Sequence, residues 1–86
     1  MPKAKPKAVK PAKLQVNLAG AWKDVAPFDA NDEDASGAIL DSAHCIGMHA
    51  TGDMKFRIVK AQDALPEVLM HWTRADGWKE WRHAAH

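Results

Sequence analysis

The chain of 86 residues has one cysteine, no tyrosine and no long run of apolar residues. A single cysteine excludes an internal disulfide and any zinc module that is rich in cysteine. No apolar run approaches the ~18–20 residues that span a bilayer, which argues against an integral membrane protein. Because no apolar stretch follows the N-terminal lysines, the N-terminus lacks the pattern of a secretory signal. We therefore expect a small cytoplasmic protein with no membrane contact.

Charge is distributed unevenly along the sequence. The first thirteen residues hold five lysines and three prolines but no acidic residue. The other seven Lys and Arg residues stand against all eleven Asp and Glu residues, so residues 14–86 have a formal charge of −4. A basic segment with so little apolar surface does not fold by itself. Residues 1–13 are therefore predicted to be a disordered tail, and residues 14–86 a single compact domain.

Two short strands are predicted directly after the tail. Residues 14–18 alternate between apolar and polar side chains, which is the period of a half-buried strand. Residues 22–28 are expected to form a second strand that closes a hairpin through Gly20. Pro27 places the end of that strand at an edge, because proline cannot donate a hydrogen bond to a neighbouring strand.

Residues 54–59 show the clearest alternation in the sequence. Their apolar side chains are expected to face the core, while Lys55 and Arg57 face the opposite side. Residues 62–66 are expected to connect this strand to the next one. The core-facing side chains of the strand are Met54, Phe56 and Ile58.

Residues 67–82 contain the strongest hairpin signal. Asp76-Gly77 is typical of a two-residue turn between antiparallel strands. That turn would place Trp72 opposite Trp81 and would put both on the core face. Trp78 would then lie on the other face, where it is either exposed or closes the hairpin end and covers a second small cluster with Leu69.

One long helix is predicted between the second and third strands. Asp29 is a suitable N-cap, and the acidic residues after it would lie near the positive end of the helix dipole. Gly52 is expected to end the helix. The predicted fold class is therefore α+β, in the order β-β-α-β-β-β, with an antiparallel sheet of four to five strands and the helix packed on one face. The apolar stripe of the helix consists of Ala35, Ile39, Ala43 and Ile46.

A calcium site is only weakly indicated. Asp32, Asp34 and Ser36 match the first half of an EF-hand loop, but Ala43 stands where the loop needs its bidentate acid. Acidic residues in the first turn of a helix explain the same pattern.

Zinc binding and nucleophilic catalysis are also weakly supported. Cys45 and His49 lie one helical turn apart, but a tetrahedral site needs further ligands, and His71 would have to supply one from the sheet. His44 is adjacent to Cys45 on the helix and does not face it, so it is poorly placed as a base. We expect no enzyme activity, no metal and no cofactor.

The basic tail indicates a polyanion as partner, most concretely nucleic acid. Lysines on a flexible chain neutralise phosphates and release counterions, without sequence specificity. Four tryptophans in so short a chain cannot all be fully buried, and an exposed one could stack on a base. The alternative is that the tail only improves solubility, and the charge of −4 on the body counts against a nucleic-acid-binding sheet. The candidate nucleic-acid-binding residues are Lys3, Lys5, Lys7, Lys10, Lys13, Lys55 and Arg57.

A protein partner is the competing hypothesis. Trp and Arg are enriched in binding hot spots, so Trp78 with Arg74 and Arg82 forms a candidate interaction surface. An exposed strand edge could also pair with a second copy, so the chain is expected to be a monomer or an edge-strand homodimer. A second candidate surface is the acidic start of the helix, which comprises Asp29, Asp32, Glu33 and Asp34.

The sequence resembles small uncharacterised proteins that phages and prophages encode. The residues that carry this resemblance run from Trp22-Lys-Asp-Val25 through Phe28-Asp29 to Gly77-Trp78-Lys-Glu-Trp81. The resemblance implies a role in host takeover, genome handling or the virion, for example as an inhibitor, an adaptor or a virion component. It assigns no functional residue.

Overall fold

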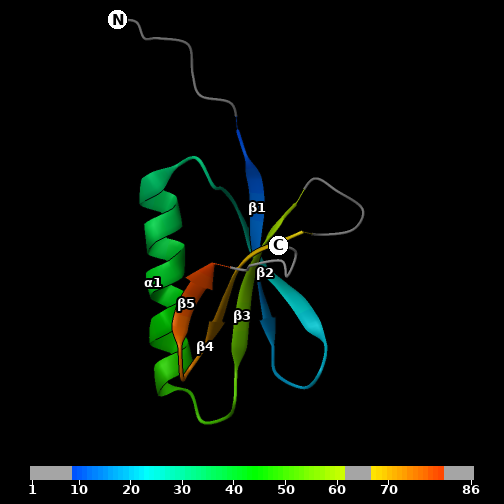
Figure 1. Ribbon diagram of the computed structural model, residues 1–86, viewed down its shortest axis with the longest axis vertical. Coiled ribbons are helices and arrows are strands. Elements are labelled where there is room, and N and C mark those ends of the chain that lie inside the picture. Colours follow the sequence, from blue (N-terminus) through cyan, green and yellow to red (C-terminus); the bar gives the residue numbers. More distant parts are fainter. Residues whose placement is uncertain (1–8, 62–66, 81–86) are drawn as a thin grey trace, which may run out of the picture.

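The computed structural model describes residues 9–61 and 67–80. Their strands form one antiparallel sheet in the spatial order β2-β1-β3-β4-β5 (Figure 1). The predicted α+β class and the antiparallel sheet are therefore confirmed, and the sheet has five strands. The elements are β1 (Pro11–Asn17), β2 (Trp22–Asp29), α1 (Glu33–His49), β3 (Lys55–Lys60), β4 (Val68–Thr73) and β5 (Gly77–Glu80).

Strand β1 begins three residues before the predicted start of the domain. Ala12 is buried in the core, and Lys13 pairs with Val59 of β3. Pro11 is tolerated as the first residue of the strand, where a missing N–H disrupts the ladder least. Its carbonyl oxygen accepts a hydrogen bond from the Ala61 amide at 3.0 Å. Residues 11–13 thus belong to the folded domain, which corrects the predicted tail boundary, and residues 1–8 lie outside the described residues.

The main core cluster lies on one side of the sheet and centres on Trp72, which is completely buried, whereas Val59, also completely buried, lies on the other side with Lys13. The Trp72 Nε1–H donates a hydrogen bond to Nδ1 of His44 on α1 at 3.0 Å. Phe56 packs edge-on against the Trp72 ring, with 5.6 Å between the ring centroids. Met54 is partly buried against the same cluster, so the predicted core face of β3 is confirmed. The buried members of the cluster are Ala12, Leu14, Ala43, Phe56, Ile58 and Trp72.

Helix α1 begins and ends at residues other than those predicted. Its N-cap is Asp32, whose Oδ1 accepts a hydrogen bond from the Ala35 amide at 3.0 Å. Asp29, the predicted N-cap, instead accepts from the amides of Lys10 and Asn31 at the end of β2. The last helical residue is His49, so the helix ends before Gly52.

The apolar stripe of α1 differs from the prediction at its last member. Ala43 is buried and Ile39 packs against the core as predicted, but Ile46 is 52% exposed, whereas the neighbouring Gly47 is buried. The reason is the Trp72 ring, which lies so close to Gly47 that a Cβ at that position would fall 2.2 Å from a ring carbon. The helix therefore turns a glycine, and not an isoleucine, towards the sheet.

The β4–β5 hairpin has a different register from the predicted one. Thr73 pairs with Gly77, and Trp72 pairs with Trp78, so the loop contains residues 74–76. Gly77 has a φ of +73°, a conformation that glycine adopts without strain. Trp78 consequently shares the face of Trp72, and its Nε1–H donates to the Leu40 carbonyl oxygen at 2.9 Å. The prediction that Trp78 faces away from Trp72 is wrong, and Trp81 lies outside the described residues, as do residues 62–66.

The two edges of the sheet are β2 and β5. Strand β2 is interrupted by a register shift opposite Leu14 and Gln15 and contains Pro27, and β5 has only four residues. Bulges, prolines and short strands all discourage pairing with another chain. An edge-strand homodimer stays a prediction. Within residues 9–61 and 67–80, no helix has the length and apolar character needed to cross a membrane.

Candidate nucleic-acid interface

The sheet face that points away from the core carries mostly polar side chains, and we call it the polar face. One row of it runs straight across all five strands, because each member is paired with the next in the ladder. This row consists of Asp24, Gln15, Arg57, His71 and Lys79. Lys13 lies on the same face to one side of the row, and Trp22, Asn17 and Lys55 lie to the other side.

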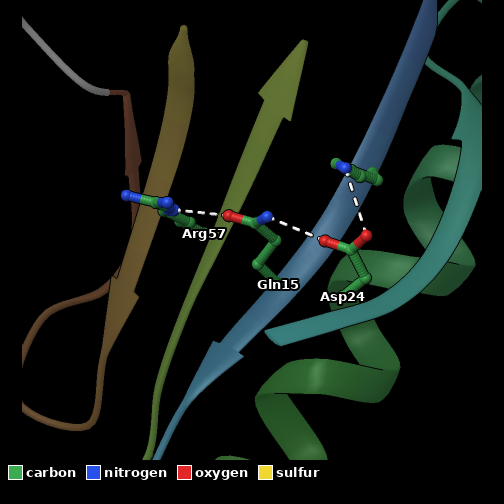
Figure 2. A network of polar contacts seen from close by, with 4 residues as sticks. Gln15, Asp24 and Arg57 are labelled. Atoms are coloured by element: carbon green, nitrogen blue, oxygen red, sulfur yellow. Dashed lines mark hydrogen bonds and ion pairs between the residues drawn. The ribbon is translucent and has the colours of Figure 1, made fainter. Parts of the chain in front are cut away.

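A chain of hydrogen bonds ties three strands together within this row (Figure 2). Arg57 Nε donates to Gln15 Oε1 at 2.7 Å, and Gln15 Nε2 donates to Asp24 Oδ1 at 2.8 Å. Lys13 Nζ donates to Asp24 Oδ2 at 3.1 Å. Gln15 is only 7% exposed, and its amide can bridge the two ions because it carries both an acceptor and a donor. The guanidinium of Arg57 is therefore held in place by side chains of the neighbouring strands.

The same contacts affect the ionisation of Asp24 and Arg57 in this row. The hydrogen bond from Gln15, followed by that from Lys13, holds the pKa of Asp24 below its ordinary value. Burial lowers the pKa of Arg57, but a guanidinium remains protonated at neutral pH. Asp24 and Arg57 are thus both ionised, with the Gln15 amide between them.

Trp22 belongs to the edge strand β2, and its side chain lies on the polar face. The Arg57 Cζ lies over the Trp22 ring, 4.2 Å from its centroid, in the geometry of a cation–π contact. The His71 ring approaches at 6.3 Å between centroids, with 66° between the ring planes. The indole thus extends from β2 to residues of β3 and β4, and it places an aromatic surface among the cations.

The sequence does not single out Trp22, because β2 is irregular. Gln15 pairs with Asp24 and Leu14 pairs with Ala26, so Val25 is an extra residue. In a regular strand, residues two apart face the same side of the sheet. The extra residue breaks this rule, so the side chains before the bulge face the side opposite to the one that regular alternation from Phe28 would give them. Strict alternation would have put Trp22 on the same side as Phe28, which packs against the core.

The polar face is basic although the body as a whole is acidic. Among the residues described, its strands carry on this face four Lys and Arg side chains and two acidic ones, Asp24 and Asp29, and Asp53 contacts Lys55 from just before β3. Most of the other acidic residues are elsewhere, four of them in or directly before α1. A local excess of positive charge attracts polyanions whatever the net charge of the chain. The four cations are Lys13, Lys55, Arg57 and Lys79.

The structure brings together three of the predicted nucleic-acid-binding residues, Lys13, Lys55 and Arg57. Lys55 Nζ lies 3.5 Å from Asp53 Oδ2, and the two side chains are 45% and 80% exposed, respectively. Lys10 is exposed directly before β1. Lys3, Lys5 and Lys7 lie outside the described residues.

The predicted protein-interaction residues are not brought together in the described structure. The Arg74 side chain donates hydrogen bonds to the carbonyl oxygens of Gly47, Ala50 and Gly52, at the end of α1. Trp78 is half-buried against the core, and Arg82 lies outside the described residues.

The residues considered for metal binding and catalysis do not form a site in the part of the chain described. Cys45 is free and exposed, and His49 Nδ1 contacts the Cys45 carbonyl oxygen at 2.9 Å, so this histidine interacts with the backbone. No group of three or more His, Cys, Asp or Glu residues there could hold a metal ion. Asp32 caps the helix, as the simpler interpretation of the acidic segment has it.

No protein-family model, curated protein or solved structure matches the chain.

The His71 environment predicts a pH dependence of stability. Burial, followed by the positive charges of Lys55 and Arg57, lowers the pKa of His71. Below about pH 6.5, where an unperturbed histidine gains a proton, the unfolded chain therefore binds more protons than the folded one. The free energy of unfolding should fall as pH is lowered through that value to the folded pKa.

His71→Gln removes this titration and should reduce the loss of stability on acidification. Urea denaturation of both proteins between about pH 7.5 and pH 5 measures the difference between their free energies of unfolding. The contributions of the other histidines are the same in both proteins and cancel in this difference. Equal pH dependence in the two proteins would contradict the assignment.

Proposed function

We propose that the protein is a small non-catalytic binding protein whose basic side chains contact a polyanion, most simply nucleic acid. The observation that carries the proposal is the polar face, where Arg57 lies over the Trp22 ring and, among the residues described, four cations outnumber the strand carboxylates Asp24 and Asp29. Lys10 adds a positive charge directly before β1, and Lys3, Lys5 and Lys7 precede it in the sequence. Genome handling is one of the three roles that the resemblance to phage-encoded proteins implies, and the resemblance does not choose among them.

The chemistry of the face supports phosphate contacts. An arginine held by a neighbouring side chain binds phosphate with little loss of side-chain freedom, and its planar fork matches the phosphate oxygens. Lysines act as mobile point charges around it. Such contacts fix position along the backbone of the nucleic acid but do not distinguish sequences.

The salt dependence of binding tests the proposal. Binding of the full chain to labelled single-stranded and duplex DNA is measured by fluorescence anisotropy across a salt series. Lys55→Gln/Lys79→Gln removes two charges from the polar face. For each phosphate that the variant no longer neutralises, the slope of log K against log salt should become shallower by about 0.9 with duplex and about 0.7 with single strands. Replacing Lys3, Lys5 and Lys7 by glutamine measures the contribution of the tail in the same way.

Lys23→Gln/Lys60→Gln is the matched control, because it removes the same charge from other positions. Lys23 pairs with Val16, and Lys60 pairs with Ala12 and contacts Glu67. This variant should bind almost like the unmodified chain. Equal weakening of binding in both double variants would mean that net charge alone determines the affinity, which would contradict a role of the polar face. If the unmodified chain does not bind DNA at low salt, the proposal as a whole is contradicted.

A protein partner remains a second candidate function because of one apolar hollow. It lies where β1 turns into β2, and Leu18 beside it is 65% exposed. An exposed apolar surface next to a lysine is suited to an apolar side chain of another protein. A complex that survives high salt would support this function over the first. The hollow is lined by Val16, Leu18, Ala19, Ala21 and Lys23.

A further inference from the structure

Trp22 differs from the two other tryptophans that the structure describes. Trp72 and Trp78 belong to the core side of the sheet, and their indole N–H groups donate to His44 and to the Leu40 carbonyl oxygen. Trp22 lies on the opposite face, where its ring meets Arg57 and His71. A large apolar ring among charged side chains contributes less to folding than a ring in the core, which leaves recognition as a reason for its position.

The side chains around Trp22 restrict where its ring can lie. Arg57 is bonded to Gln15, and Gln15 to Asp24, so the cation under the ring cannot move freely. The cation–π contact with Arg57 then fixes the indole relative to three strands of the sheet. An aromatic ring that is already positioned loses little conformational freedom when a second ring stacks on it.

We propose that Trp22, positioned by Arg57, is a stacking platform for an unpaired base and makes the polar face prefer single-stranded nucleic acid to duplex. The inference rests on the proposed function and adds the class of nucleic acid to it. Bases within a duplex are stacked on one another, so their faces are not free to stack on the indole. In a single strand the base stacks on the indole while neighbouring phosphates contact Lys55, Arg57 and Lys79.

Stacking is tolerant of sequence because every base has a π-face, so no strong base preference is expected. Lys55 pairs across the sheet with Asn17, which in turn pairs with Trp22, so one cation lies in the same row as the indole. Arg57 and Lys79 belong to the next row. All three cations lie on the interior side of the edge strand that carries Trp22, in two successive rows, so successive phosphates of one strand can be contacted next to one stacked base.

The test uses the full chain and three labelled probes: a short oligothymidylate, an abasic oligonucleotide of equal length and a duplex of equal length. Trp22→Leu should weaken binding of the oligothymidylate by about 5- to 150-fold, the range for one stacked base. Binding of the abasic strand and of the duplex should change by less than about 2-fold, because neither presents an unpaired base to the ring. Lys79→Gln is the control, and it should weaken all three probes together because it acts only on phosphates.

Trp22→Phe keeps the test valid if the leucine variant does not fold. Phenylalanine retains a ring, so most of the preference for the oligothymidylate over the abasic strand should remain. In the unmodified chain the oligothymidylate should quench tryptophan fluorescence, and Trp22→Phe should abolish this quenching. The inference is overturned if Trp22→Leu weakens the oligothymidylate and the abasic strand equally, or if it weakens neither. If the unmodified chain binds none of the three probes, the proposed function fails with it.

Discussion

Gly47→Ala is expected to destabilise the protein by about 2 kcal/mol. The new Cβ would lie 2.2, 2.4 and 2.9 Å from three ring carbons of Trp72, which is completely buried and cannot move aside. Overpacking of this kind costs about 1–3 kcal/mol or more, and the overlap places Gly47 at the upper end. Replacing glycine by alanine in a helix stabilises the helix by up to ~1 kcal/mol, which offsets part of this cost. For a domain whose stability is roughly 3–5 kcal/mol, the remaining loss is about half of the total.

Gly37→Ala is the matched control, because it makes the same change in the same helix. Among the described residues, no atom beyond the adjoining helix backbone lies within 4 Å of the position that a Cβ would take there. The variant should therefore stabilise the protein by about 0.5–1 kcal/mol through helix propensity alone. Circular dichroism during thermal unfolding should show a lower midpoint for Gly47→Ala, by about 8–16 °C, and a higher one for Gly37→Ala. Equal shifts in the two variants would contradict the close contact between α1 and Trp72.

Arg74→Ala is expected to cost about 1–2 kcal/mol, an unusually large effect for an exposed side chain. The last carbonyl groups of a helix have no partners within the helix, and they carry partial negative charge. Arg74 supplies donors to three of them or their neighbours, with distances of 2.8 to 3.2 Å to Gly47, Ala50 and Gly52. Because Arg74 belongs to the loop after β4, its removal should loosen the end of α1 from the sheet.

Arg74→Lys separates the geometry of this contact from its charge. Lysine keeps the positive charge at the end of the helix but cannot span three carbonyl oxygens with a planar fork. It should recover less than half of the stability that Arg74→Ala removes, measured by urea denaturation. Full recovery would show that charge alone matters at this position. Amide hydrogen exchange should also rise in the last turn of α1 in Arg74→Ala, and unchanged exchange there would argue against a role in holding the helix end.

Several elements follow from local sequence. The alternation in residues 54–59 assigns Phe56 and Ile58 to the core and Arg57 to the other face, because the period of a strand is a local property. The second strand is predicted at residues 22–28 and is found at Trp22–Asp29. The helix is predicted in the middle of the chain, although its ends differ by a few residues. Such ends depend on which of several adjacent acidic side chains caps the backbone, and composition does not decide that.

The candidate site could be predicted only in part. Lys13, Lys55 and Arg57 are predicted to bind a polyanion, and they lie together on the polar face. The sequence points to Trp78 as the exposed tryptophan, but the hairpin register turns Trp78 towards Leu40. The net negative charge of the body does not exclude a basic sheet face, because net charge does not reveal which residues share a face.

The sequence by itself determined the α+β class, most of the strands and the separation of the basic N-terminus from an acidic body, since each follows from residues that are neighbours in the chain. Tertiary structure alone decided the bulge at Val25, the hairpin register and the choice of Gly47 as the helical residue against Trp72. Each of these depends on how two distant segments fit together in space. One extra residue in a strand reverses the direction of every side chain before it. That reversal places Trp22 beside Arg57, 35 residues away in the sequence.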